Sequence, residues 1–117
     1  MSEGVSAGQG PDFAVAAALD LELEPVPSEQ VVAGSPATGS AAFGEFGGHE
    51  YGVWAHTAGV STDVEADEVF VVLSGAATVA FEDGTVVSLV PGTVGRLREG
   101  QRTVWTVTET LRKVYFS

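Results

Sequence analysis

The chain has 117 residues and a formal net charge of −11, with 44% hydrophobic residues and no cysteine. This length predicts a single domain with one core, and the lack of cysteine excludes a disulfide framework, a thiolate nucleophile and a cysteine-based zinc site. The acidic charge disfavours nucleic acid and anionic membranes as partners. No apolar run approaches membrane-spanning length and the N-terminus does not resemble a signal peptide, so we expect a cytoplasmic protein.

The charges are unevenly distributed along the chain. Residues 1–95 hold fourteen acidic residues and no Lys or Arg, whereas all five basic residues lie in the last 22 positions. The basic segment can attract a small anionic ligand or pair with the acidic remainder, within the chain or across a dimer, and we favour pairing.

The N-terminal part is predicted to be peripheral. Residues 1–12 are small, polar and Gly-rich, and we take residues 1–19 as a flexible segment before a domain at 20–117. Asp12 can cap a short helical turn over residues 13–19. Residues 21–24 alternate as in an edge strand or extended arm, which the prolines at 25 and 27 end.

The next stretch predicts short strands and loops. Residues 31–33 and 41–46 are strand candidates, and residues 34–40 form a loop by composition. Residues 49–57 are a clearer strand, with Trp54 and His56 on one face and Val53 and Ala55 on the other. Residues 60–66 form an acidic approach to the central strand.

Residues 67–75 (DEVFVVLSG) are the predicted central strand, ended by a tight turn at Gly75. Alternation places Glu68, Phe70 and Val72 on one face. The other face is apolar too, which predicts a strand buried on both sides. An inward carboxylate at Glu68 is paired, protonated or functional.

The rest of the chain continues the pattern of strands and turns. Asp83-Gly84 is typical of a hairpin turn. Strands recur every eight to twelve residues, as in a sandwich or small barrel. Further strands are expected at residues 77–81, 85–90, 93–97, 103–108 and 111–116.

Two spacings resemble the cupin motifs. Glu68, six residues and then Gly75 match the second half of the first motif. Pro91-Gly92, five residues, a segment ending in Gly100, two residues and then Thr103 follow the second. With Trp54, Trp105 and the Arg112–Tyr115 ending, the sequence resembles small single-domain cupins of the RmlC-like superfamily, related to the ureidoglycine aminohydrolase and ethanolamine-utilisation cupins. The resemblance covers about residues 20–117. It implies an all-β double-stranded β-helix, or jelly-roll cupin barrel, with a short N-terminal arm, and a homodimer.

The sequence departs from the family at the metal ligands. Metal-binding cupins carry three histidines and a glutamate, and of these the chain keeps Glu68. The paired-histidine positions fall at Thr62 and Val64 or at Ser61 and Asp63, and the second-motif histidine is Thr103. We therefore expect no conventional metal site and no cofactor.

Other residues offer weaker alternatives for a cation. His56, and less directly His49, can approach Glu68 as unconventional metal ligands, although a lone His beside a Trp is more often a packed residue. Asp63, Glu65 and Asp67 carry oxygen ligands suited to Ca²⁺, but we favour a solvated acidic edge.

A barrel without the metal predicts an apolar and aromatic pocket that holds a small molecule. In it Glu68 is the candidate acid/base. The expected ligand-binding residues are Trp54, His56, Phe70, Val72, Thr103, Trp105 and Tyr115. The resemblance allows a metal-independent isomerase, epimerase or cyclase; the alternatives are a non-catalytic binding or sensing cupin and a metal cupin that uses Glu68 and His56.

Each pocket residue also has a structural interpretation. Trp105 and Phe70 can fill the barrel, and Tyr115 can lie inside it or at a dimer interface. Glu68 can bond to a backbone N–H or pair with Arg96, Arg102 or Arg112, a structural role that we weigh equally with the functional one.

Overall fold

The computed structural model describes residues 8–10 and 12–117, and these residues form antiparallel strands and two short 3-10 turns. No helix among them is long and apolar enough to cross a membrane. The strands are β1 (Gly8–Gly10), β2 (Phe13–Ala14), β3 (Glu24–Pro25), β4 (Val31–Ala33), β5 (Ala37–Phe46), β6 (His49–His56), β7 (Gly59–Val64), β8 (Glu68–Phe81), β9 (Val86–Leu89), β10 (Val94–Leu97) and β11 (Arg102–Phe116). The 3-10 turns are η1 (Ala16–Ala18) and η2 (Ser28–Gln30).

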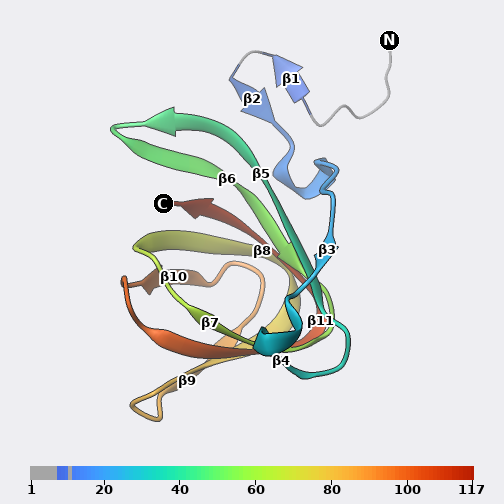
Figure 1. Ribbon diagram of the computed structural model, residues 1–117. Helices are drawn as coiled ribbons and strands as arrows, with labels where there is room; N and C mark the ends of the chain where they lie inside the picture. The colour runs from blue at the N-terminus through green and yellow to red at the C-terminus, as the bar shows by residue number, and fades with distance from the viewer. Residues whose placement is uncertain (1–7, 11) are drawn as a thin grey trace.

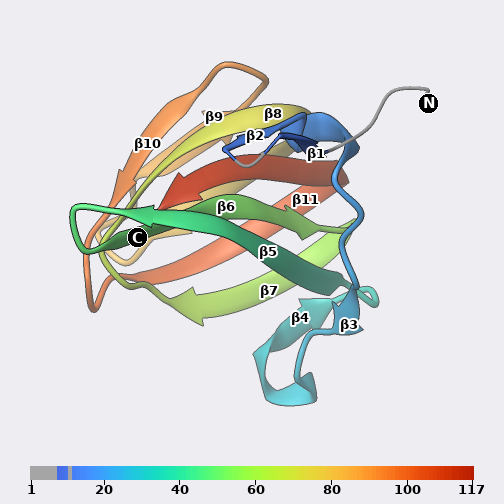
Figure 2. The same ribbon diagram turned by 90° about the horizontal axis from the view of Figure 1, so that it is seen from above.

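Two long strands, β8 and β11, form the centre of the barrel and belong to both of its walls. The first half of β8 pairs with β10 and with the second half of β11, which also pairs with β6; β5 and β3 continue this wall. The second half of β8 pairs with β9 and with the first half of β11, which also pairs with β7 and then β4. The strands curl around a common interior, as the two views show (Figures 1 and 2), and this is the jelly-roll cupin barrel that the sequence predicts.

The turn predicted at Gly75 is wrong, because β8 runs through it without a break. Gly75 has φ +98°, and a Cβ at this position would clash with the Thr110 carbonyl oxygen. The register between β8 and β11 shifts at this point. Gly75 is therefore a bend between two closely spaced strands, and the strands predicted at 103–108 and 111–116 are likewise halves of β11.

Burial of the central strand also differs from the prediction. Its inward face is buried at Phe70 and Val72, but Val69 on the outer face is 41% exposed. Val71 and Leu73 on the same face are half-buried, so this face is only partly covered, as is common in antiparallel sheets.

The helical turn predicted over residues 13–19 is wrong except for the three residues of η1. No side chain caps this turn. The Arg112 guanidinium donates hydrogen bonds to the carbonyl oxygens of Ala16 (2.8 Å) and Leu19 (2.9 Å). These contacts hold the segment against the barrel in an extended path. Of the segment predicted to be flexible, residues 1–7 and 11 lie outside the described residues.

Two further local predictions were wrong and one was confirmed. The loop predicted at 34–40 ends early, since β5 begins at Ala37 and pairs with β6. The acidic approach at 60–66 is largely strand β7. The Asp83-Gly84 hairpin is present, with Gly84 at φ +92° between β8 and β9.

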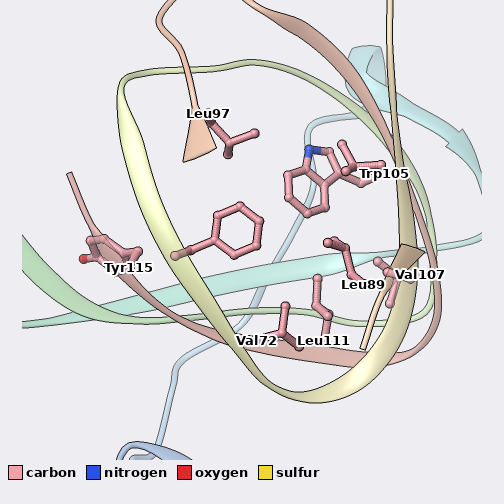
Figure 3. Packing of buried hydrophobic residues seen from close by; sticks show 10 residues of the cluster. Val72, Leu89, Leu97, Trp105, Val107, Leu111 and Tyr115 are labelled. Carbon is pink, nitrogen blue, oxygen red and sulfur yellow. The ribbon is translucent and has the colours of Figure 1, made fainter. Parts of the chain in front are cut away.

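The apolar core fills one part of the barrel interior. Leu97, Trp105, Leu89, Val107, Val72 and Leu111 point into the same space, and Tyr115 lies to one side near the end of β11 (Figure 3). Strand alternation supplies these residues from β8, β9, β10 and β11, and leaves the rest of the interior to the polar side chains described next.

Candidate functional site

A small cavity adjoins the apolar core inside the barrel. Its volume is about 160 Å³, below the range of about 300–1,000 Å³ of pockets for drug-sized molecules. Trp54, Trp105, Glu65, Glu68 and Lys113 come from three strands and the β7–β8 connection to meet here. The remaining lining residues are Ser40, Glu50, Asp63, Tyr115 and Ser117.

Glu68 and Lys113 form an ion pair in this cavity. The distance from Lys113 Nζ to Glu68 Oε2 is 2.6 Å, and the two side chains are 5% exposed for Lys113 and 17% exposed for Glu68. The contact does not have the geometry of a hydrogen bond, and Glu68 Oε2 has no other hydrogen-bond partner. The pair is therefore held by the attraction between its two charges. The carboxylate predicted from the first cupin motif is therefore paired.

The predicted partners of Glu68 were wrong. Arg96 contacts Asp67 on the surface, at 3.4 Å, and Arg112 holds the N-terminal segment. Arg102 lies on the exposed side of β11. Adjacent residues in a strand point to opposite faces, so Lys113 faces Glu68 and Arg112 does not. Sequence reasoning considered Arg112 and missed Lys113.

Lys113 also lies over three aromatic rings. Its Nζ is 4.4 Å from the Trp54 ring centroid, 4.5 Å from that of Phe70 and 5.0 Å from that of Trp105. Such contacts stabilise a cation by attraction to the ring faces. The aromatic residues predicted as pocket walls thus surround an ammonium group of the chain itself.

Glu65 is a second buried carboxylate, and the predicted solvated edge is wrong for it. The residue is 8% exposed. Its Oε2 accepts hydrogen bonds from Thr103 Oγ1 (2.6 Å) and Trp105 Nε1 (3.0 Å). Asp67, in contrast, lies on the surface, where the backbone N–H of Glu99 and the Arg96 guanidinium lower its pKa.

Two further acidic residues border the cavity. Desolvation, and then the nearby Glu65 charge, raise the pKa of Asp63. Tyr115 donates a hydrogen bond of 2.6 Å to Glu50, and burial raises the pKa of its hydroxyl well above the usual value. Glu50 lies at the start of β6. Sequence reasoning missed it because it is one of many acidic residues and belongs to no motif.

His56 lies inside the barrel but does not border the cavity. Its Nδ1–H donates to the Thr57 carbonyl oxygen (2.6 Å), and Nε2 accepts from Ser61 Oγ (2.8 Å). Burial lowers its pKa, which keeps the ring neutral. Because both ring nitrogens are occupied, His56 is not available as a ligand beside Glu68. The exposed His49 and Glu68 both border a separate outer hollow.

The donor set does not fit the metal that cupins commonly hold. The paired motif histidines fall at Thr62 and Val64 or at Ser61 and Asp63, and Ser61 is hydrogen-bonded to His56. The third position is Thr103, which is hydrogen-bonded to Glu65. The Lys113 ammonium lies against Glu68 and repels a second cation there. Within residues 8–10 and 12–117, no group of three His, Cys, Asp or Glu side chains is placed to hold a metal ion.

The barrel and its inward glutamate define the class of protein as a cupin. The model of the EutQ-like cupin domain family matches residues 43–115, and the chain belongs to this family. This membership supports a small-molecule-binding or enzymatic cupin. The likeness to ureidoglycine aminohydrolase cupins stays a prediction.

Solved structures share the fold at low sequence identity. A protein of unknown function from Pseudomonas syringae pv. tomato is 20% identical with a TM-score of 0.75, over 89% of this chain and 46% of that chain. The EutQ protein of Clostridium difficile is 15% identical with a TM-score of 0.60, over 69% and 67%. A structure reported for the DMSP lyases RdDddP and RnDddQII is 13% identical with a TM-score of 0.58, over 68% and 46%. This chain thus spans less than half the length of the Pseudomonas protein. No curated protein matches the sequence.

Proposed function

We propose that the protein binds a small metabolite in the barrel cavity and acts on it by metal-independent proton transfer, as an isomerase, epimerase or cyclase does. The observation that carries this proposal is the Glu68–Lys113 pair at the wall of a cavity lined by Trp54 and Trp105. A carboxylate, an ammonium and aromatic walls are the parts needed to bind, orient and deprotonate a small organic molecule.

Glu68 is the proposed acid/base. It removes a proton from one atom of the ligand and returns it to another, so that atoms and charge balance over the cycle. Lys113 stays an ammonium and stabilises the negative charge that develops on the ligand when the proton leaves. Thr103 and Trp105 donate hydrogen bonds to Glu65 and hold its carboxylate beside the cavity.

The charges around the cavity limit the class of ligand. Glu50, Asp63, Glu65 and Glu68 face one cation, Lys113. This excess of carboxylates repels anions. We therefore expect a neutral or cationic molecule with a small apolar body.

The test is a comparison of wild type with Glu68→Gln. Neutral and cationic metabolites are screened by thermal shift, and bound compounds are then followed by NMR for conversion. Loss of conversion with retained binding supports the proposal, and an exposed-site control, Glu82→Gln, should behave as wild type. Unchanged conversion by Glu68→Gln rules out Glu68 as the base.

The second candidate is a non-catalytic binding or sensing cupin. The observation that favours it is that Glu68 Oε2 lies directly against Lys113, as in a structural ion pair. Stoichiometric binding of a compound that is never converted, by wild type and Glu68→Gln alike, would support this candidate.

A further inference from the structure

The geometry points to Lys113 as the resident cation of this cupin pocket, bound in a receptor site for a small alkylammonium group formed by Glu68, Trp54, Phe70 and Trp105. The Lys113 ammonium then supplies the positive charge beside Glu68, where the family resemblance implies a metal ion. This role does not depend on turnover, so it stands or falls separately from the proposed enzymatic function.

The contacts of the ammonium are those of a cation receptor. One carboxylate oxygen lies at 2.6 Å, and three ring centroids lie at 4.4–5.0 Å. Each ring comes from a different strand, β6, β8 or β11, so the cage exists only in the folded barrel. Carboxylate and aromatic faces together are the groups by which proteins bind organic ammonium ions.

The burial of Lys113 separates this arrangement from a surface ion pair. The residue is 4% exposed, whereas lysine is almost never fully buried unless it is paired. A surface pair contributes little because solvent screens it. Here the rings exclude solvent, and the ammonium borders the cavity, so its charge acts on whatever binds there.

The ammonium also explains why this barrel departs from the cupin ligand set. Glu68 remains at the ligand position, but its negative charge is balanced by Lys113 rather than by a divalent ion. Because no divalent ion is needed to balance Glu68, imidazole ligands for such an ion are not needed either. The paired-histidine positions hold Thr62 and Val64 or Ser61 and Asp63, and the third holds Thr103. Of these, Ser61 and Thr103 bond to other side chains and Asp63 borders the cavity.

Lys113→Ala tests the receptor by emptying it. The substitution removes three carbons and the nitrogen, so n-propylammonium replaces the lost atoms. We expect n-propylammonium to bind this variant and raise its melting temperature. 1-Propanol, similar in size but uncharged, should bind at least about tenfold more weakly. Trp54 and Trp105 should report binding by fluorescence, because both rings line the vacated space.

The matched control is Lys113→Ala combined with Glu68→Gln. In this double variant we expect the preference for n-propylammonium over 1-propanol to disappear. Equal binding of both compounds by Lys113→Ala, or binding of neither, would overturn the inference. Wild type, whose receptor is filled, should show no preference for n-propylammonium over 1-propanol.

A measurement on wild type keeps the inference testable if Lys113→Ala does not fold. Lys113 is the single lysine of the chain, so its side-chain NMR signals are assigned without ambiguity. We expect its ε-methylene protons to be shifted upfield by the three rings and its position to change in Glu68→Gln. The shifts of a solvated lysine, unchanged by Glu68→Gln, would show that the receptor does not exist.

Discussion

Glu65 is a buried carboxylate whose value to the fold lies in the two donors that it satisfies. Thr103 Oγ1 and Trp105 Nε1 both donate to its Oε2. Trp105 Nε1 also lies 3.0 Å from Thr103 Oγ1, so the three side chains form one network. A network of this kind fixes the Trp105 ring, which forms part of both the core and the cavity wall.

Removal of the Glu65 carboxylate should therefore destabilise the protein. We expect Glu65→Ala to lower the free energy of unfolding by about 1–3 kcal/mol, because the Thr103 hydroxyl loses its acceptor in a buried position. Urea unfolding followed by Trp fluorescence measures this change. Glu82→Ala, at an exposed turn, should stay within about 0.5 kcal/mol of wild type. Equal effects of the two substitutions would contradict the network.

His56 predicts how stability depends on pH. Burial lowers its pKa in the folded state below 6.5, although the nearby backbone carbonyl opposes the shift and Lys113 adds to it. The unfolded chain therefore binds the proton first as the pH falls. The contribution of neutral His56 is complete above about pH 6.5 and is lost progressively as the pH falls from there to the folded-state pKa.

The measurement is urea unfolding between about pH 7.5 and pH 5. Wild type and His49→Gln should lose stability over this range, since His49 is exposed. His56→Gln should be less stable at pH 7.5 but should show a shallower slope. If His49→Gln, and not His56→Gln, made the dependence of stability on pH shallower, His56 would not be the group responsible.

Among the larger elements, the bend at Gly75 decides whether β8 and β11 can serve both walls of the barrel. The residue has positive φ, and a Cβ added to it would meet the backbone of Thr110 and Leu111 at close range. Glycine is needed here for two reasons, conformation and space.

Gly75→Ala should therefore lower the free energy of unfolding more than an alanine substitution at a glycine whose only special feature is its positive φ. Gly48 is such a control, with φ +83° and no atom within 4 Å of the methyl group that an alanine would add. We expect a cost of about 1–2 kcal/mol for Gly48→Ala and at least twice that for Gly75→Ala, measured by chemical unfolding. Similar costs would mean that the two strands separate easily at the bend.

At the scale of the whole molecule, the sheet leaves several strand edges and apolar side chains in solvent. β10, β9, β4 and β3 end the pairing order, and Val94 on β10 is 69% exposed. Exposed edges of this kind favour pairing with another chain. Together with the family resemblance, they support our proposal of a homodimer; a cytoplasmic location stays a prediction from the sequence.

The homodimer is tested by light scattering. We expect twice the mass of the 12.0 kDa chain at micromolar concentration, and a lower mass at higher dilution. A monomer at micromolar concentration would contradict the proposal.

Local sequence patterns determined the class of fold, most of the strands and the inward position of Glu68. Period-two alternation and turn glycines depend on neighbouring residues, so they are visible in the chain itself. They failed at Gly75, because a bend and a turn use the same residue, and only the facing backbone of β11 distinguishes them.

The partners of the inward residues were decided by the tertiary structure alone. The sequence pattern groups Glu65 with Asp63 and Asp67 on a solvated edge, and for Glu68 it offers a backbone N–H or an arginine as structural partners. The contacts of Glu65 with Thr103 and Trp105 join residues about forty positions apart, and those of Glu68 with Lys113 join residues 45 positions apart. Which charge meets which depends on strand order and register, and these are properties of the closed barrel and not of any one strand.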